Sequence, residues 1–189
     1  KVEKIELIKI SFKLIDHYGW INFTLEKLAK KKSMDLKNLK LIFRSKVQIL
    51  IDFSKLIDEQ VQKNIDIEEL KENDVKDNLF ELLMMRFEKL NPYKKTLRVL
   101  VNDLRYDPVS LKIFSKKIFE TMDFYMELSN AKSTYVLDVV KSNVFFLIYL
   151  YCFQIWLKDN TKEMSPTMAE VDKLLTYAET YTKKINLFL

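Results

Sequence analysis

The sequence is poor in residues that break helices and in residues that hold metals. Its 189 residues include one Gly, three Pro, one Cys and one His. So little Gly and Pro excludes collagen-like and linker-rich chains and all-β folds, because tight turns need residues that tolerate positive φ. Gly-rich phosphate loops are excluded for the same reason. The single Cys and single His also exclude an intrachain disulfide and metal sites built from several Cys or two His.

The overall composition is typical of a folded protein, and charge is distributed unevenly along the chain. Hydrophobic residues make up 48% and charged residues 31%, a balance typical of folded proteins. Residues 1–50 hold 12 Lys or Arg and 5 Asp or Glu, a net charge of +7, whereas the remainder holds 20 and 22, a net of −2. This asymmetry is typical of a small basic module that meets a polyanion, joined to a region with another role.

Apolar residues spaced three and four apart predict helices along most of the chain. In the first helix Ile5, Ile8, Phe12 and Ile15 share a face, and Gly19 is expected at its C-cap. Two short helices follow, with Thr24 and Asp35 as the predicted N-caps. Longer helices are expected from Ser45 to Asn64 and from starts at Asn73–Asp74, Pro92, Pro108, Ser133 or Thr134, and Ser165–Pro166.

These elements predict an all-α fold of about nine helices. We expect a three-helix helix-turn-helix domain at residues 1–46 and a helical regulatory and dimerisation bundle at residues 47–189. The most apolar run, residues 144–157, is shorter than the roughly 20 residues of a bilayer span. A buried core helix or an interface helix is therefore favoured there, and a cytoplasmic location is expected for a chain with one free Cys and no evident signal sequence.

Residues 24–43 have the layout of a helix-turn-helix, in which a first helix braces a second that enters the DNA major groove. Lysines flank both predicted helices and can contact phosphates, while Asn can read adenine and Lys can read guanine. Double-stranded DNA is thus the expected partner. The predicted DNA-binding residues are Thr24, Lys31, Lys32, Lys37, Asn38, Lys40 and Lys46.

The same stretch resembles the DNA-binding domain of the tetracycline-repressor (TetR/AcrR) family. The matching positions, aligned without gaps, are Gly19, Thr24, Leu28-Ala29, Lys32–Asp35, Leu39, Phe43, Ser45-Lys46 and Leu50. Segments such as Asp77–Glu81 and Pro166–Asp172 are similar to the regulatory domain of one bacterial subgroup. The resemblance implies a homodimeric, ligand-responsive transcriptional regulator, of the repressor type, with no enzymatic activity.

Five positions depart from the family pattern: Ser33, Asp35, Leu36, Lys40 and Ile42. Ser33 replaces the turn glycine, and Lys40 and Ile42 replace the two tyrosines of the recognition helix. Together with Gly19-Trp20, these changes are also compatible with a second group of the same fold, lipid-binding accessory proteins of quinone biosynthesis. The alternative function is therefore a lipid carrier with a degenerate DNA-binding module.

The resemblance further implies an apolar ligand pocket and a dimer interface in the C-terminal region. The expected pocket residues are Met84, Met85, Phe87, Phe114, Phe119, Tyr125 and Tyr149. The expected interface residues are Phe146, Leu150, Phe153, Leu157, Leu174 and Leu175. The sequence contains no catalytic constellation and no metal-ligand spacing, so neither an enzyme nor a cofactor is expected.

Overall fold

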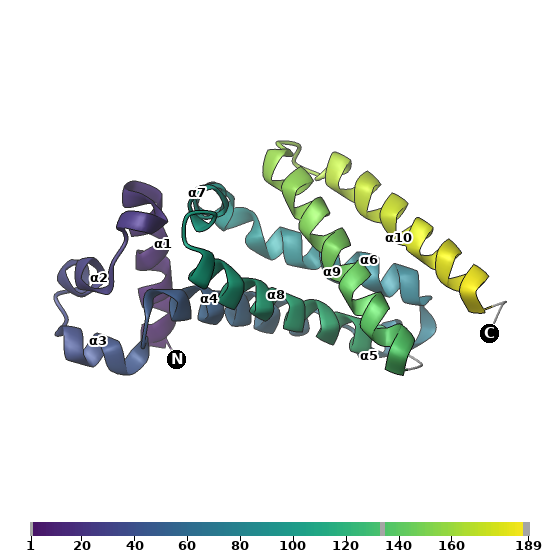
Figure 1. The fold of residues 1–189 in the computed structure, drawn as a ribbon, viewed down its shortest axis with the longest axis horizontal. Helices are drawn as coiled ribbons and strands as arrows, with labels where there is room; N and C mark the ends of the chain where they lie inside the picture. The colour runs from purple at the N-terminus through teal and green to yellow at the C-terminus, as the bar shows by residue number, and fades with distance from the viewer. Residues whose placement is uncertain (1, 133–134, 187–189) are drawn as a thin grey trace. The chain divides into compact units, whose positions relative to one another are not determined.

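The computed structural model describes residues 2–132 and 135–186, and all regular structure within these ranges is helical (Figure 1). The all-α prediction is thereby confirmed. The elements in chain order are α1 (Val2–Asn22), α2 (Leu25–Lys32), α3 (Leu36–Ile42), α4 (Lys46–Gln62), α5 (Ile67–Glu72), α6 (Val75–Leu90), the 3₁₀ turn η1 (Asn91–Tyr93), α7 (Lys94–Leu104), α8 (Pro108–Leu128), α9 (Tyr135–Lys158) and α10 (Ser165–Asn186).

The chain divides into two compact units. The N-terminal unit comprises the residues up to Glu59 together with Leu90–Lys117, and the C-terminal unit comprises Gln60–Lys89 together with the residues from Ile118 onward. The N-terminal unit therefore contains α1 to α3 and also α7, which packs against α1. The functional boundary expected between residues 46 and 47 stays a prediction, because the division into compact units follows packing and not function.

Side-chain caps fix the ends of the short helices in the N-terminal unit. The hydroxyl of Thr24 accepts a hydrogen bond from the backbone N–H of Lys27 at 3.3 Å, and the carboxylate of Asp35 accepts one from the N–H of Lys37 at 2.6 Å. Both predicted N-caps are confirmed. Each cap satisfies a backbone donor that the first helical turn leaves without a partner, typically worth about 1 kcal/mol.

Three details differ from the sequence-based expectation. Gly19 has the expected positive φ of 75°, but helical turns resume after it, so it makes a kink within α1 and not a C-cap. Pro92 lies in η1 and α7 begins two residues later. The short helix α5, capped by Asp66, was not predicted, since only six residues give too little periodicity to read. The proposed caps Ser133 and Thr134 lie outside the described residues.

Aromatic rings fill the core of the C-terminal unit. Phe87 on α6 stacks against Tyr149 and Trp156 on α9, with ring centroids 5.7 and 5.6 Å apart. The carboxylate of Asp159, directly after α9, accepts hydrogen bonds from the N–H and hydroxyl groups of both Thr161 and Thr167. Asp159 therefore ties the end of α9 to the first turn of α10, which packs against α9.

Candidate nucleic-acid interface and ligand groove

A tight turn through Ser33 joins α2 to α3. Ser33 adopts the left-handed conformation, with φ 53° and ψ 41°, at the position where the resembling family has glycine. Its N–H donates to the carbonyl of Lys30 at 3.2 Å, and the N–H of Met34 donates to that of Ala29 at 2.9 Å. These bonds close the C-terminus of α2 and hold the turn, at a steric cost of about 1 kcal/mol for a residue with a Cβ atom.

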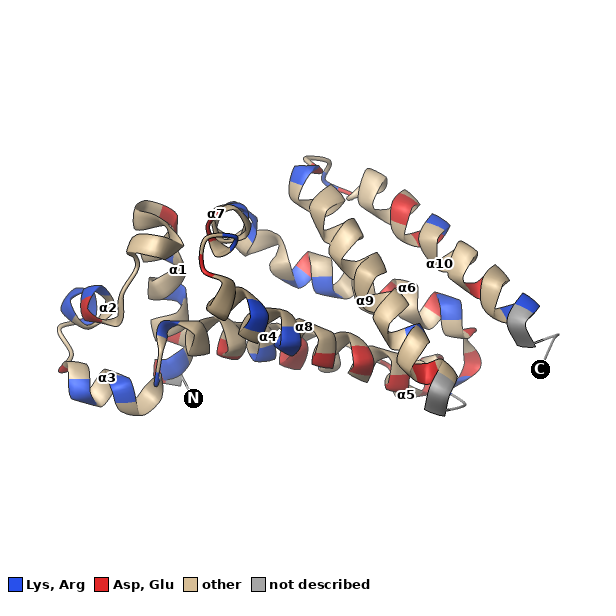
Figure 2. Ribbon diagram, in the orientation of Figure 1, with Lys and Arg blue, Asp and Glu red and all other residues tan. Residues whose placement is uncertain are grey.

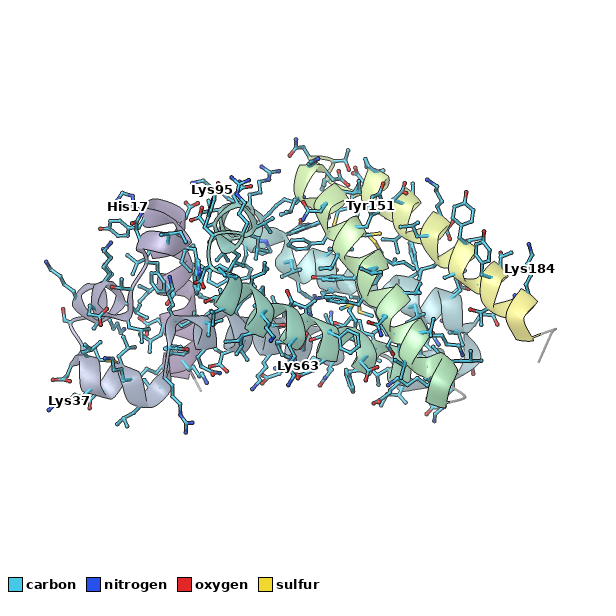
Figure 3. The ribbon with its side chains drawn as sticks, in the orientation of Figure 1. His17, Lys37, Lys63, Lys95, Tyr151 and Lys184 are labelled. Atoms are coloured by element: carbon cyan, nitrogen blue, oxygen red, sulfur yellow. The ribbon has the colours of Figure 1, made fainter. Side chains whose placement is uncertain are left out.

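The inner face of α3 is buried and its outer face is open. Leu39 and Phe43 have no exposed surface, whereas Lys37, Asn38 and Lys40 are exposed. Figure 3 shows Lys37 extending away from the helices behind α3. The short helix α3 is thus anchored through its apolar residues and presents its polar residues outward, an arrangement that reading a DNA groove would require.

Cations gather on α2 and α3, as the blue segments of Figure 2 show. Lys30, Lys31 and Arg44 are exposed along with Lys37 and Lys40. Lys32 is half-buried, and its Nζ lies 2.6 Å from Oε1 of Glu6. The two carboxylates that α2 and α3 themselves carry or are capped by, Glu26 in the first turn of α2 and Asp35 at the N-cap of α3, both occupy helix N-termini, where negative charge is stabilised.

Lys46 lies within a polar network centred on Trp20. Its Nζ donates to the carbonyl of Trp20 at 3.0 Å and lies 4.4 Å from the centroid of the indole ring. The indole N–H of Trp20 donates to Oδ2 of Asp107 at 3.0 Å, and the backbone N–H of Trp20 donates to Oδ2 of Asp103 at 2.7 Å. Partial burial lowers the pKa of Lys46, against the opposing pull of Asp107 and Asp103. The network fixes the kinked end of α1 to the start of α4.

Gly19 allows this network to form. A Cβ atom at Gly19 would stand 2.8 Å from Oδ2 of Asp103, the atom that accepts the bond from Trp20. The backbone angles of Gly19, φ 75° and ψ 162°, also lie in a region that almost only glycine occupies. Glycine is therefore required at position 19 for two reasons: its backbone angles disfavour any residue with a Cβ atom, and Asp103 leaves no room for that atom.

The C-terminal unit contains an apolar groove of about 660 Å³. Its walls come from the start of α6, the end of α8, the first half of α9 and the second half of α10. Most of the lining is apolar, including Leu79, Met126, Val144, Phe145 and Ile148. The charged lining residues are three lysines, each in an ion pair, and two carboxylates: Lys76, Lys141, Lys183, Asp74 and Glu179. A groove of this size and lining can take a small, mostly apolar ligand.

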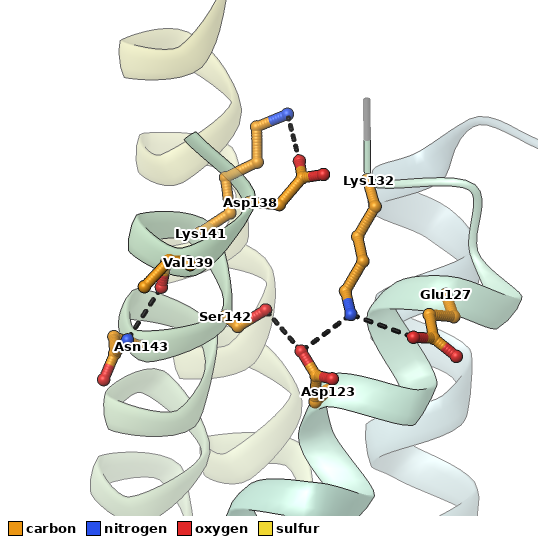
Figure 4. A network of polar contacts seen from close by, with 8 residues as sticks. All are labelled: Asp123, Glu127, Lys132, Asp138, Val139, Lys141, Ser142 and Asn143. Atoms are coloured by element: carbon orange, nitrogen blue, oxygen red, sulfur yellow. Dashed lines mark hydrogen bonds and ion pairs between the residues drawn. The ribbon is translucent and has the colours of Figure 1, made fainter. Parts of the chain in front are cut away.

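A polar network holds the wall formed by α8 and α9 (Figure 4). Oδ1 of Asp123 accepts a hydrogen bond from the hydroxyl of Ser142 at 2.7 Å and lies 2.8 Å from Nζ of Lys132. Burial raises the pKa of Asp123, but the bonds from Lys132 and Ser142 outweigh it and lower the pKa overall. The bond from Ser142 to Asp123 thus joins α9 to α8 beside the groove, and Lys132, in the connection after α8, neutralises the carboxylate.

The residues expected in the ligand pocket do not line this groove. Phe87, Tyr125 and Tyr149 are buried in the aromatic core of the C-terminal unit, and Phe119 packs edge-on against Phe146 at 5.5 Å. Met84 and Met85 are half-buried on α6, and Phe114 is half-buried in the N-terminal unit. Sequence spacing identified apolar residues, but it cannot tell a filled core from the wall of an open groove.

The residues expected in the dimer interface differ in exposure. Leu157 and Leu175 are buried within the protomer, Phe146, Phe153 and Leu174 are half-buried, and Leu150 is exposed. Leu150 belongs to a larger set of apolar side chains that are exposed on these helices. It comprises Val139, Val140, Val144, Leu147, Leu150 and Tyr151 on α9 and Tyr177 and Tyr181 on α10, and we call it the α9–α10 apolar face. Three of its members, Val140, Val144 and Tyr181, also line the groove.

Other chemistry has little support in the described parts of the chain. No group of three or more His, Cys, Asp or Glu side chains within residues 2–132 and 135–186 is placed to hold a metal ion. Burial raises the pKa of the Cys152 thiol to about 12, so this thiol is a poor nucleophile.

The segment Leu137–Lys158 of α9 is long and apolar enough to cross a bilayer, by length and composition alone.

One solved structure supplies the comparison that decides the fold. A TetR transcriptional regulator from Nitrosomonas europaea ATCC 19718 superposes with a TM-score of 0.75 and 17% sequence identity, covering 95% of this chain and 99% of that chain. The chain has a TetR-like fold. No protein-family model and no curated protein matches the sequence. At this low identity the likeness establishes the fold alone, and function has to be argued from the TetR-like chain's own residues.

Proposed function

We propose that this TetR-like chain is a DNA-binding transcriptional regulator of the cytoplasm, without enzymatic activity. The observation that carries the proposal is the outer face of α3, where Lys37, Asn38 and Lys40 are exposed while Leu39 and Phe43 anchor the helix from within. Exposed cations along α2 and α3 supply phosphate contacts, and the polar residues of α3 reach base edges in the major groove. The net charge of +7 over residues 1–50 favours a polyanionic partner.

The phosphate contacts fall to the exposed cations of the module. We assign them to Lys30, Lys31, Lys37, Lys40 and Arg44. Thr24, Lys32 and Lys46 were also predicted to bind DNA, and each already has a partner within the protein: the N–H of Lys27, the carboxylate of Glu6 and the carbonyl of Trp20. These three would have to exchange those bonds to reach a phosphate, so we rank them below the exposed cations.

We further propose that the regulator is a homodimer joined through the α9–α10 apolar face. A surface with this many exposed apolar side chains is typical of a protein interface. A two-fold dimer would present two α3 helices to two half-sites about one DNA turn apart, and the operator would then be a palindrome. An apolar ligand in the groove would change operator affinity if it bound one spacing of the modules more tightly than another, as expected for a repressor.

Selection from a random duplex pool tests DNA recognition. The wild-type chain should enrich duplexes with two related half-sites, whereas the double variant Lys37→Ala/Lys40→Ala should enrich none. The matched control is Lys55→Ala/Lys63→Ala, which removes two exposed lysines outside α2 and α3 and should select the same sites as the wild type. Equal enrichment by the wild type and the Lys37/Lys40 variant would contradict the proposal.

A second candidate function rests on the groove in the C-terminal unit. Its apolar lining and volume of about 660 Å³ also suit a lipid carrier whose DNA-binding module is degenerate. Mass spectrometry of organic extracts from the purified protein distinguishes the two functions when it is combined with the selection. A carrier should contain a bound isoprenoid or acyl lipid and should enrich no duplex. A regulator should enrich duplexes whether or not it contains a lipid.

A further inference from the structure

Leu41 on α3 is the most exposed large apolar side chain among the described residues, with 85% of its surface accessible. The other apolar residues of this segment turn inward: Leu39 and Phe43 are fully buried, and Leu36 and Ile42 are half-buried. Folding of the protomer therefore gains nothing from an apolar residue at this position. The exposed side chain of Leu41 is therefore available for contact with another molecule.

The neighbours of Leu41 define the kind of surface it belongs to. Lys37 and Asn38 precede it by four and three residues, so all three share one helix face. Lys40 and Arg44 are exposed on either side. Between Leu25 and Lys46, all of which is described, no other large apolar side chain is exposed. A membrane or a protein partner would need a broader apolar patch, whereas a single apolar residue among cations suits DNA.

The major groove of DNA offers one apolar group on its base edges, the C5-methyl group of thymine. A leucine can remove that methyl group from water, and a side-chain amide can pair with N6 and N7 of adenine. Asn38 and Leu41 are separated by about 4.5 Å along the helix axis, close to the rise of one base pair. Side chains at these two positions can therefore contact neighbouring base pairs.

We propose that Leu41 is a specificity-determining residue that contacts a thymine methyl group, next to an adenine read by Asn38. This inference rests on the proposed DNA-binding function and deepens it. It predicts that each half-site contains a thymine beside an adenine. A thymine at that position is preferred over every other base because only thymine carries the methyl group.

Replacement of thymine by deoxyuridine tests the contact, because it removes the methyl group and leaves base pairing intact. Thymines of a duplex selected by the wild-type protein are replaced one at a time, and affinities are measured by fluorescence anisotropy. At one position in each half-site the wild type should bind the uracil duplex about fourfold more weakly, the effect of one buried methyl group. Leu41→Ala should bind the thymine and uracil duplexes equally at that position.

A control variant tests whether the loss of discrimination is specific to Leu41, and two different outcomes would contradict the inference. Ile67→Ala removes an apolar side chain that is 65% exposed on α5 and should keep the wild-type discrimination. Discrimination that persists in Leu41→Ala, or that no position shows in the wild type, would overturn the inference while leaving DNA binding intact. Failure of the wild type to bind any duplex would overturn the proposed function and this inference with it.

Discussion

Two surfaces of this chain are exposed for opposite reasons. The face formed by α2 and α3 carries cations with one leucine among them, whereas the α9–α10 apolar face carries valines, leucines and tyrosines. A cationic face is stable in water and attracts a polyanion, but an extended apolar face is costly until a partner covers it. This contrast is the basis for our proposal that the first surface binds a polyanion reversibly and that a second copy of the chain covers the second permanently.

The largest effect should come from a charge placed on the apolar face. Leu147→Glu puts a carboxylate at a position on α9 that is 61% exposed in the protomer. If a second copy covers this face, an unpaired buried carboxylate should raise the dimer dissociation constant at least about 100-fold. Sedimentation velocity measures the change. The matched control is Val109→Glu on α8, also exposed, which should leave the dimer intact; a Leu147→Glu protein that remains dimeric would show that the interface lies elsewhere.

A second large effect is expected inside the unit that supports the cationic face. Gly19→Ala forces a side chain into a backbone conformation reserved for glycine and brings Cβ to 2.8 Å from Oδ2 of Asp103. The free energy of unfolding should fall by about 2–3 kcal/mol. Urea denaturation followed by circular dichroism measures this loss. Lys13→Ala, at an exposed position of the same helix, should change it by less than about 0.5 kcal/mol, and an equally small loss for Gly19→Ala would refute the assigned role.

The corresponding support in the C-terminal unit is Asp159. Burial raises its pKa, but four hydrogen bonds from Thr161 and Thr167 outweigh burial and lower the pKa from 3.8 to about 2. A folded-state pKa below the unfolded value contributes stability that is complete above about pH 4 and is lost as the pH falls toward 2, a contribution of about 2 kcal/mol.

Asp159→Asn should therefore lose about 2 kcal/mol at pH 7 and should lose this part of the acid sensitivity between pH 4 and 2. Thermal melts across that pH range measure both effects. Glu163→Gln, exposed in the same connection, is the control and should behave as the wild type. An Asp159→Asn protein with the wild-type pH profile would mean that the threonine bonds do not stabilise the ionised form.

The smallest effect concerns the turn between α2 and α3. Ser33 holds a left-handed conformation that costs a residue with a Cβ atom about 1 kcal/mol, so Ser33→Gly should stabilise the protein by up to that amount. The same change at Ser115, within α8, should instead destabilise it. Differential scanning calorimetry of the two variants gives the signs. A loss of stability for Ser33→Gly would mean that the serine side chain contributes more than its strain costs.

The sequence predicted the local structure well because each local signal had a direct physical cause. Thr24 and Asp35 cap the helices they were expected to cap, and Pro108 and Ser165 begin theirs. Gly19 was recognised as a positive-φ residue, but its close approach to Asp103, a residue 84 positions away, was not predicted. Such a contact between distant residues leaves no mark in the local pattern.

The candidate sites were less predictable. An apolar spacing looks the same for Phe87, which is buried in a ring stack, and for Val144, which lines the groove. The sequence likewise could not show that Leu41 turns outward, because α3 is short and four of its seven residues are apolar. From the Ser45-Lys46 motif, Lys46 was predicted to contact a phosphate. The structure shows that its ammonium group instead donates to the carbonyl of Trp20.

The most direct test of the account is the salt dependence of DNA binding by the wild-type chain. Binding to a selected duplex is measured by fluorescence anisotropy at several salt concentrations. If three to five cations per protomer contact phosphates, the plot of log affinity against log salt should have a slope of about −3 to −4.5 for each half-site bound. A slope near zero, or no binding at low salt, would contradict the claim that the outer face of α2 and α3 is a nucleic-acid interface.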